Sequence, residues 1–186
     1  MEKTRKILDT ALRLFVEFGF HGTPTSKIAQ EAGVANGTLF NKFATKDELV
    51  VAVYIDIKRR MHEYVVQNST QESTLKETLK GQYLASLYWA LDNKNEFIFM
   101  QQFKSSPFHS FITPEQIEES VKPFCDMLQQ GIDANILKPL PLDYLFTLVS
   151  SHTFGLNEYL LNNQFSKAKQ HAIISDTFDL LWDMIT

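Results

Sequence analysis

The chain has 186 residues, of which 44% are hydrophobic and 22% charged, a composition that favours a compact fold with a buried core. Its apolar runs are far shorter than the ~20 residues of a membrane-spanning helix, and its start is rich in charge, so we expect neither a membrane segment nor a secretion signal. A single cysteine, Cys125, excludes an internal disulfide and indicates the reducing cytoplasm. With only 7 glycines and 6 prolines, the sequence predicts an all-α protein.

The net charge of −4 hides an asymmetry along the chain. Residues 1–48 carry seven basic and six acidic side chains, whereas the remainder carries 11 basic and 16 acidic ones. Residues 1–48 therefore have a net charge of only +1, too little for a basic arm that binds DNA by charge alone. Any interaction with DNA would therefore depend on where individual residues lie.

Three expected helices occupy the first part of the chain. Apolar residues recur at helical spacing over 3–18, and Gly19 follows as a stop signal. Short second and third helices are expected over 24–32 and 37–43, with Gly33 between them. The inward side chains of the third helix are expected to be Leu39, Phe40 and Phe43.

Capping residues support these boundaries. Thr23 is expected to cap the second helix, with Pro24 at its first position, where a missing N–H costs nothing. Asn36 is a good cap for the third helix. Thr45 and Glu48 fit the Thr-x-x-Glu capping box, which predicts a fourth helix of about twenty residues.

The rest of the chain is expected to be helical as well. The pattern predicts further helices at 72–91, 94–104, 114–135, 141–162 and 167–185, which gives about nine in all. Pro123 lies inside one of these patterns and predicts either a kink there or a boundary just before it.

The second and third helices have the geometry of a helix-turn-helix, in which the second of the pair enters the DNA major groove. Small Ala29 and Ala32 would let the two helices pack closely. The outward residues of the reading helix would be Thr38, Asn41 and Lys42. A hydroxyl and an ammonium suit phosphate, and an amide can bond adenine through two hydrogen bonds. A helical hairpin with a glycine turn also occurs in purely structural domains.

A longer combination of residues is much more specific. It consists of Gly19-Phe20, Thr23-Pro24-Thr25, Ile28-Ala29, Glu31-Ala32-Gly33-Val34, Gly37-Thr38-Leu39-Phe40, Phe43 and Lys46-Asp47-Glu48-Leu49. With these residues, segment 5–52 closely resembles the DNA-binding domain of the tetracycline-repressor (TetR) family of bacterial regulators. The resemblance implies a helix-turn-helix DNA-binding domain over 1–46 and a larger helical ligand-binding and dimerisation domain over 47–186. It also implies a homodimer that binds double-stranded, near-palindromic operator DNA, usually as a repressor, and is released by a small-molecule effector.

Residue by residue, the resemblance places the family's phosphate contacts on Thr25, Gly37, Phe40 and Lys46, and its base-reading region on 34–38 and 41–42. Asn36 stands where many members have a basic residue, and Phe40 stands where many have a tyrosine hydroxyl. We therefore expect affinity to depend more strongly on the nearby lysines. The predicted DNA-binding residues are Thr25, Lys27, Asn36, Gly37, Thr38, Phe40, Asn41, Lys42 and Lys46.

Aromatic residues are concentrated in segment 97–111, which holds five of the 15 phenylalanines. For any one of them an ordinary core position is the simpler interpretation, but as a group they predict an apolar cavity for a hydrophobic or aromatic effector. The predicted ligand-binding residues are Trp89, Phe97, Met100, Phe103, Phe108, Phe111, Phe124, His152 and Asn157.

The last two expected helices are too apolar to face water. A hairpin of these helices, paired with its symmetry mate as a four-helix bundle, would hide both apolar stripes and supply the twofold symmetry that a palindromic site requires. The predicted dimer-interface residues are Leu148, His152, Gly155, Tyr159, Ile174, Phe178, Leu181 and Ile185.

The sequence contains no catalytic or cofactor motif. Its five histidines include no pair at the spacing that lets one helix chelate a metal, so we expect no metal, no cofactor and no enzymatic activity. The alternative function is an all-helical carrier or enzyme that uses the aromatic pocket, which would require a polar catalytic cluster.

Overall fold

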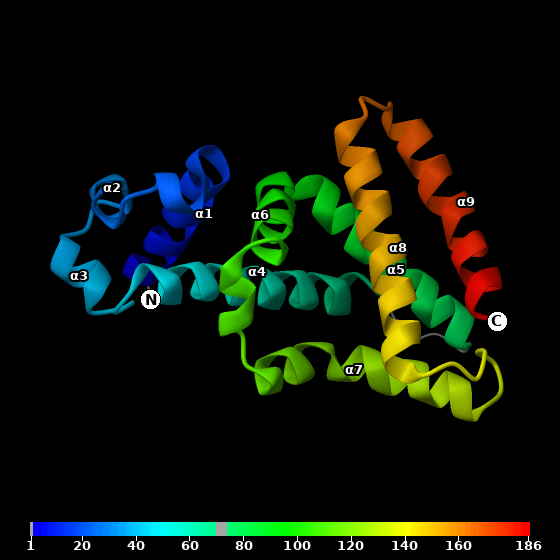
Figure 1. The fold of residues 1–186 in the computed structure, drawn as a ribbon. Coiled ribbons are helices and arrows are strands. Elements are labelled where there is room, and N and C mark those ends of the chain that lie inside the picture. Colours follow the sequence, from blue (N-terminus) through cyan, green and yellow to red (C-terminus); the bar gives the residue numbers. More distant parts are fainter. Residues whose placement is uncertain (1, 70–73) are drawn as a thin grey trace. The chain divides into compact units, whose positions relative to one another are not determined.

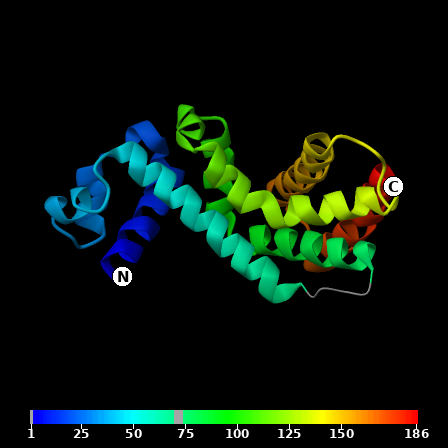
Figure 2. The same ribbon diagram turned by 90° about the horizontal axis from the view of Figure 1, so that it is seen from below.

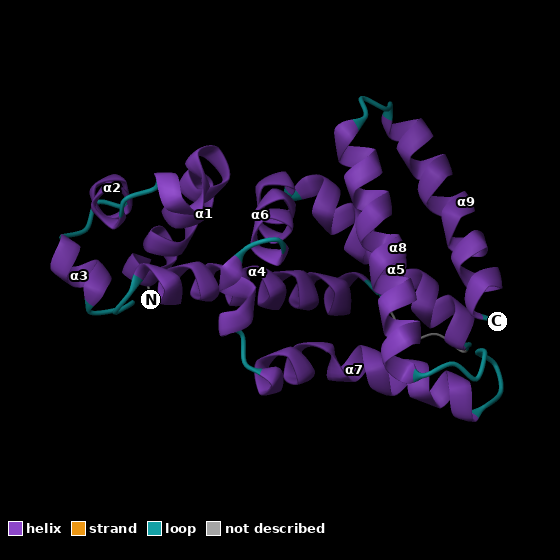
Figure 3. Ribbon diagram, in the orientation of Figure 1, coloured by secondary structure: helices purple, strands orange, loops and turns teal. Residues whose placement is uncertain are grey.

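The computed structural model describes residues 2–69 and 74–186 and confirms the all-α prediction (Figure 1, Figure 3). Within these residues it contains nine α-helices, one 3-10 helix and no strand. The helices are α1 (Glu2–Gly22), α2 (Thr25–Glu31), α3 (Asn36–Phe40), α4 (Lys46–Asn68), α5 (Leu75–Asp92), α6 (Lys94–Lys104), η1 (Pro107–Phe111), α7 (Pro114–Asp133), α8 (Leu142–Asn162) and α9 (Lys167–Ile185). The first two residues of the helix predicted at 72–91 lie outside the described residues.

The chain divides into two compact units. The first comprises residues 1–60 and 93–117, and the second comprises residues 61–92 and 118–186. The chain passes between them within α4, at the α5–α6 junction and within α7, and Figure 2 shows α4 as one continuous helix. The boundary that the sequence predicts after residue 46 stays a prediction, but by packing the first unit also includes α6 and η1.

The core of the first unit is aromatic. Phe15 and Phe20 of α1 pack against Phe99 of α6, with ring centroids 6.2 and 5.4 Å apart. Phe20 also meets Phe108 of η1 at 5.2 Å. Phe103 of α6 lies 6.1 Å from Phe99. These contacts fix α1, the first helix of the DNA-binding motif, to a segment about eighty residues further along the chain.

This packing places most of the aromatic residues that the sequence assigns to a ligand cavity at 97–111 in the core of the first unit, and the cavity itself stays a prediction. Phe97, Phe99 and Phe103 are at most 2% exposed, and Phe108 is 7% exposed, because they fill the core of the first unit. Phe111 is 54% exposed and belongs to the surface. Helical spacing of aromatic residues is the same for a core and for a pocket, so the sequence could not separate the two.

The end of α1 differs from the prediction in its capping. Gly19 adopts a left-handed φ of 73° that breaks the helix before its last turn. The Thr23 hydroxyl is fully buried and lies within hydrogen-bond distance of the Leu14 and Gly19 carbonyl oxygens, at 3.1 and 2.8 Å. Thr23 therefore closes the end of α1 and does not cap α2, whose N-cap is Pro24.

Of the caps predicted for α3 and α4, one is wrong and one is confirmed. Asn36 is the first residue of α3 and Ala35 is its N-cap, so the prediction of an Asn36 cap is wrong. The predicted capping box at α4 is confirmed, because the Glu48 amide donates to the Thr45 hydroxyl oxygen at 3.1 Å. The Glu48 carboxylate accepts from the Ala44 amide at 2.8 Å.

An ionic network ties three helices of the first unit together. The Asp56 carboxylate of α4 lies 3.0 Å from Arg5 of α1 and 3.0 Å from Arg60 of α4. Arg60 continues to Glu96 of α6 at 2.9 Å, and Arg59 also binds Asp56 at 2.8 Å. Burial raises the pKa of Asp56, but hydrogen bonds and charges from the three guanidinium groups together lower it below its ordinary value.

The second unit is built around α5, α8 and α9, which pack on one another. Figure 1 shows α8 and α9 side by side as a hairpin. Its core contains Leu79, Tyr83, Leu145, Val149, Leu160, Ile174, Phe178, Leu181 and Ile185. The helix α7 continues through Pro123 as one helix, so a boundary before that proline is wrong.

Replacing Phe99 with alanine should destabilise the protein by about 3–5 kcal/mol, because the ring is fully buried among other aromatic rings. Phe111→Ala is the matched control in the adjoining segment, and its exposed ring should cost less than about 1 kcal/mol. Urea unfolding of both variants measures this difference. Equal effects of the two substitutions would contradict an aromatic core at α6.

The Asp56 network should also give the protein a specific sensitivity to acid. Because the pKa of folded Asp56 is depressed, its stabilisation is present above the ordinary carboxyl pKa of about 4 and is lost as pH falls through the lower folded value. Asp56→Asn should cost about 1–3 kcal/mol near neutral pH. The gap in unfolding free energy between wild type and variant should then shrink below about pH 4. A gap that stays constant to about pH 2 would show that the network does not lower this pKa.

Candidate nucleic-acid interface

The turn between α2 and α3 is closed by the hydrogen bonds of a Schellman motif. The Gly33 amide donates to the Gln30 carbonyl at 3.2 Å, and the Val34 amide donates to the Ala29 carbonyl at 3.0 Å. Gly33 has a φ of 68°, a left-handed conformation that glycine adopts without a steric penalty. The turn therefore has one defined shape, which fixes the direction in which α3 leaves it.

Packing of the helix pair leaves one side of α3 outward. Ile28 and Ala29 of α2 are at most 1% exposed. Leu39 of α3 is 0% exposed and Phe43 is 9% exposed, so both point inward as predicted. Phe40 was expected to point inward with them, but 46% of it is exposed, so that expectation is wrong. Phe40 instead shares the outward side of the pair with the predicted DNA-binding residues.

The structure brings these residues together at the helix-turn-helix. Asn36, Gly37, Phe40, Asn41 and Lys42 are exposed, whereas Thr25, Lys27, Thr38 and Lys46 are half-buried. They come from the first turn of α2, from α3 and from the first residue of α4. Amide, hydroxyl and ammonium groups thus gather on adjoining short elements, as a DNA-reading surface requires.

Lys27 is held by its neighbours in α1 and α2. Its ammonium lies 3.7 Å from the centroid of the Phe18 ring and 4.0 Å from the Glu31 carboxylate. Arg13 of α1 forms an ion pair with the same carboxylate. These contacts brace α2 against α1, and they compete with a phosphate for the Lys27 charge.

Lys46 begins α4, where unpaired backbone amides favour a negatively charged partner. Burial lowers the pKa of the Lys46 ammonium, and the Asp47 carboxylate partly offsets this. A half-buried ammonium beside a helix N-terminus is already partly desolvated. It is therefore well placed to bind a phosphate of the DNA backbone.

The nine residues predicted to bind an effector divide between the two units. Phe97, Met100, Phe103, Phe108 and Phe111 lie in the first unit, and Trp89, Phe124, His152 and Asn157 lie in the second. In the second unit, the Tyr83 hydroxyl lies 3.4 Å from His152 Nδ1 and 3.2 Å from the Thr177 hydroxyl. Burial lowers the pKa of His152.

The predicted dimer residues of α9 need a correction. Ile174, Phe178, Leu181 and Ile185 are 0% exposed, because they form the core of the second unit. They cannot offer a surface to another subunit. On α8, Gly155 and Tyr159 are exposed as a surface requires, and Leu148 and His152 are half-buried.

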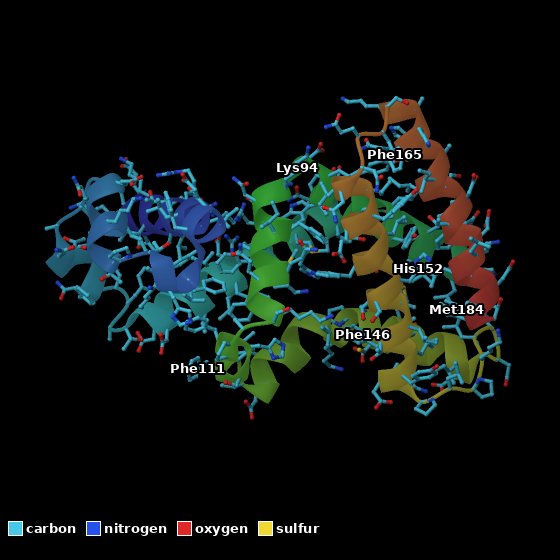
Figure 4. All side chains as sticks on the ribbon, turned by 45° about the horizontal axis from the view of Figure 1, so that its top comes forward. Lys94, Phe111, Phe146, His152, Phe165 and Met184 are labelled. Carbon is cyan, nitrogen blue, oxygen red and sulfur yellow. The ribbon has the colours of Figure 1, made fainter. Side chains whose placement is uncertain are left out.

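A different apolar stripe on α8 and α9 is exposed, and the sequence analysis did not identify it. Tyr144 of α8 is 52% exposed, and Leu180 and Met184 of α9 are 66% and 39% exposed. Figure 4 labels Met184 on α9 and His152 on α8. The exposed and buried stripes of α9 are adjacent in sequence, so apolar spacing alone could not tell which one faces the subunit core.

Within residues 2–69 and 74–186, no three histidine, cysteine or acidic side chains come close enough to hold a metal ion. Over the same part of the chain, no helix combines the length and apolar character needed to cross a membrane.

The comparisons with known proteins agree with the helix-turn-helix geometry. A family model for bacterial regulatory proteins of the tetR family matches residues 7–53. A tetR family transcription regulator from Shewanella sp. PV-4 has a solved structure that matches with a TM-score of 0.90 and 27% identity, over 100% of this chain and 98% of that one. Residues 7–53 thus match the tetR family of bacterial regulators, and the whole chain is similar to a solved regulator of that family.

Further proteins similar to this chain are transcription regulators. The repressor KstR2 of Mycobacterium tuberculosis is 25% identical over 158 residues, which cover 80% of this chain and 76% of the relative. The fatty acid metabolism regulator protein of Bacillus subtilis is 31% identical over 77 residues, 41% of this chain, and the match spans only 40% of that relative. The structure of FadR from Bacillus subtilis in complex with stearoyl-CoA shares the fold, with a TM-score of 0.76 and 21% identity over 98% of this chain and 100% of that one.

Lys46 and Asn41 should affect DNA binding in different ways. Lys46→Ala removes a charge beside the DNA backbone, so binding to all duplexes should weaken alike and the slope of log affinity against log salt should fall by about one. Asn41→Ala should instead relax base preference and leave that slope nearly unchanged. Titrations at several salt concentrations with matched and mismatched duplexes measure both effects. Altered preference with an intact salt slope in Lys46→Ala would contradict the assignment.

Proposed function

We propose that this protein is a dimeric transcriptional repressor that binds a palindromic operator and is released by a small hydrophobic effector. The observation that carries the proposal is the outward side of α3, where Asn36, Asn41 and Lys42 are exposed after a turn of defined shape. The match of residues 7–53 to the tetR family and the repressor among the relatives support the same function.

The exposed face of the α8–α9 hairpin supports the homodimer. Tyr144, Leu148, Gly155 and Tyr159 follow one another at helical spacing on α8, and the added side chain of an alanine at Gly155 would meet nothing within 4 Å. Exposed glycine inside a helix costs about 1 kcal/mol, which the close approach of a second copy could offset. A twofold dimer through this face would present two copies of α3 to the two halves of a palindrome.

The effector is proposed to act in the second unit. Its apolar core and the fatty-acid regulators among the similar proteins support a hydrophobic effector, such as a fatty acyl compound. The helix α4 follows α3 along the chain, and its last residues belong to the second unit. A shift of its far end would move α3, and the two reading helices would lose the separation of about one DNA turn that both half-sites require.

Selection from a pool of random duplexes tests this function. The purified protein should enrich an inverted repeat whose half-sites are about one DNA turn apart, centre to centre. A carrier or enzyme would recover no common sequence, and that result would overturn the repressor proposal.

Leu180→Glu should dissociate the dimer, because it places a charge in the middle of the proposed apolar interface, where the wild-type side chain is 66% exposed in the single chain. The expected loss is about 3 kcal/mol or more of dimer stability. Ser175→Glu is the control, since Ser175 is exposed on α9 away from the apolar stripe. Sedimentation should find a monomer for the first variant and a dimer for the second. A dimer in both cases would move the interface elsewhere.

A further inference from the structure

One face of α8 carries three polar side chains, which follow Phe146, a ring that packs against the core of the second unit. Phe146, Ser150, Thr153 and Asn157 are spaced by four, three and four residues, which places them on one side of the helix. We call these four residues the polar face of α8. It begins at Phe146, which Figure 4 labels on α8. The Phe146 ring lies 6.2 Å from the Phe124 ring of α7 in the same unit.

Asn157 is the unusual member of this face. Only 3% of the residue is exposed, and no described residue offers a hydrogen-bond partner to its Oδ1 atom. A buried carbonyl oxygen without a partner is costly, and such a group in a folded protein calls for an explanation. In the second unit, a bound molecule that supplies the missing donor would be that explanation.

The two hydroxyl groups of the face are also limited to accepting hydrogen bonds. The Thr153 hydroxyl donates its proton to the Val149 carbonyl at 2.8 Å. The Ser150 hydroxyl donates to the Thr147 carbonyl at 3.3 Å. Both protons are used within α8, so these two residues offer the lone pairs of their oxygens, and Asn157 Nδ2 is the donor group of the face. Together with Asn157 Oδ1, they form a row of acceptors along one helix.

We infer that the polar face of α8 binds the hydrogen-bond-donating part of the effector, a neutral group with an amide N–H or a hydroxyl, joined to an apolar chain. A bare carboxylate suits this position less well, because it would face three acceptor oxygens and could accept a hydrogen bond only from Asn157 Nδ2. Phe146 and Phe124 provide apolar contact at one end of the face. The inference rests on the proposed function, since it names the chemistry of the effector that the repressor would recognise.

Two probes of equal chain length test the inference with the full chain. Dodecanamide carries an N–H donor, and methyl dodecanoate carries acceptors only. The wild-type protein, freed of bound lipid, should bind the amide about threefold to tenfold more tightly than the ester in calorimetric titrations. Dodecanoate should bind no more tightly than the ester.

Asn157→Leu should erase the preference for the amide and raise the melting temperature of the ligand-free protein by about 2–4 °C, because a buried amide without a partner is replaced by an apolar side chain of similar size. Asn162→Leu, an exposed asparagine at the end of the same helix, is the matched control and should change neither quantity. Thr153→Val keeps the shape of the side chain and should reduce the preference in part.

Several outcomes would overturn the inference. Equal binding of both probes, tighter binding of the ester or the carboxylate, or failure of both probes to bind wild-type protein would each do so. A lower melting temperature in Asn157→Leu would show that the amide is already satisfied in the folded chain. Enrichment of an inverted repeat by wild-type protein would leave the repressor function standing in every one of these cases.

Discussion

The contact between α1 and α6 is the constraint on which the DNA-reading surface depends. The helices α2 and α3 have 7 and 5 residues, too few to be stable in water alone. The helix α3 packs on α2, and α2 packs on α1, which is held in turn by the rings of Phe15 and Phe20 against Phe99 and Phe108. The network around Asp56 ties α4 to the same two helices. The reading helix is thus supported by residues about sixty positions further along the chain.

The helix α8 combines three roles on separate faces. Leu145, Val149 and Leu160 face the core, and Tyr144, Gly155 and Tyr159 face outward, where we propose a second subunit. The polar face ending at Asn157 is the third side. Any molecule that moves or tightens α8 through its polar face also acts on the proposed dimer surface. An effector bound there would therefore act on the packing of the proposed dimer.

Local signals made most of the fold predictable from the sequence. The spacing of apolar residues and the capping box at Thr45 placed the helices within a few residues of their observed bounds. Which side of a helix faces the core was harder to predict from the sequence. The sequence could not show that Phe99 packs on α1 or that Leu181 faces inward while Leu180 faces outward, because tertiary partners decide both. The orphan oxygen of Asn157 was equally hidden, since burial and the absence of a partner are properties of the packed unit.

Native-state hydrogen exchange tests most directly whether α1 and α6 form one structural unit. At low denaturant concentrations, the slowest amides of α1 and α6 should exchange through one common opening with the same free energy and the same dependence on denaturant. The amides of α2 and α3 should exchange with an opening free energy no higher than that of this unit, since the two helices depend on it for their stability. Exchange of α6 at a free energy well below that of α1 would contradict the account, because it would show that the DNA-reading helices are stable without the aromatic contact.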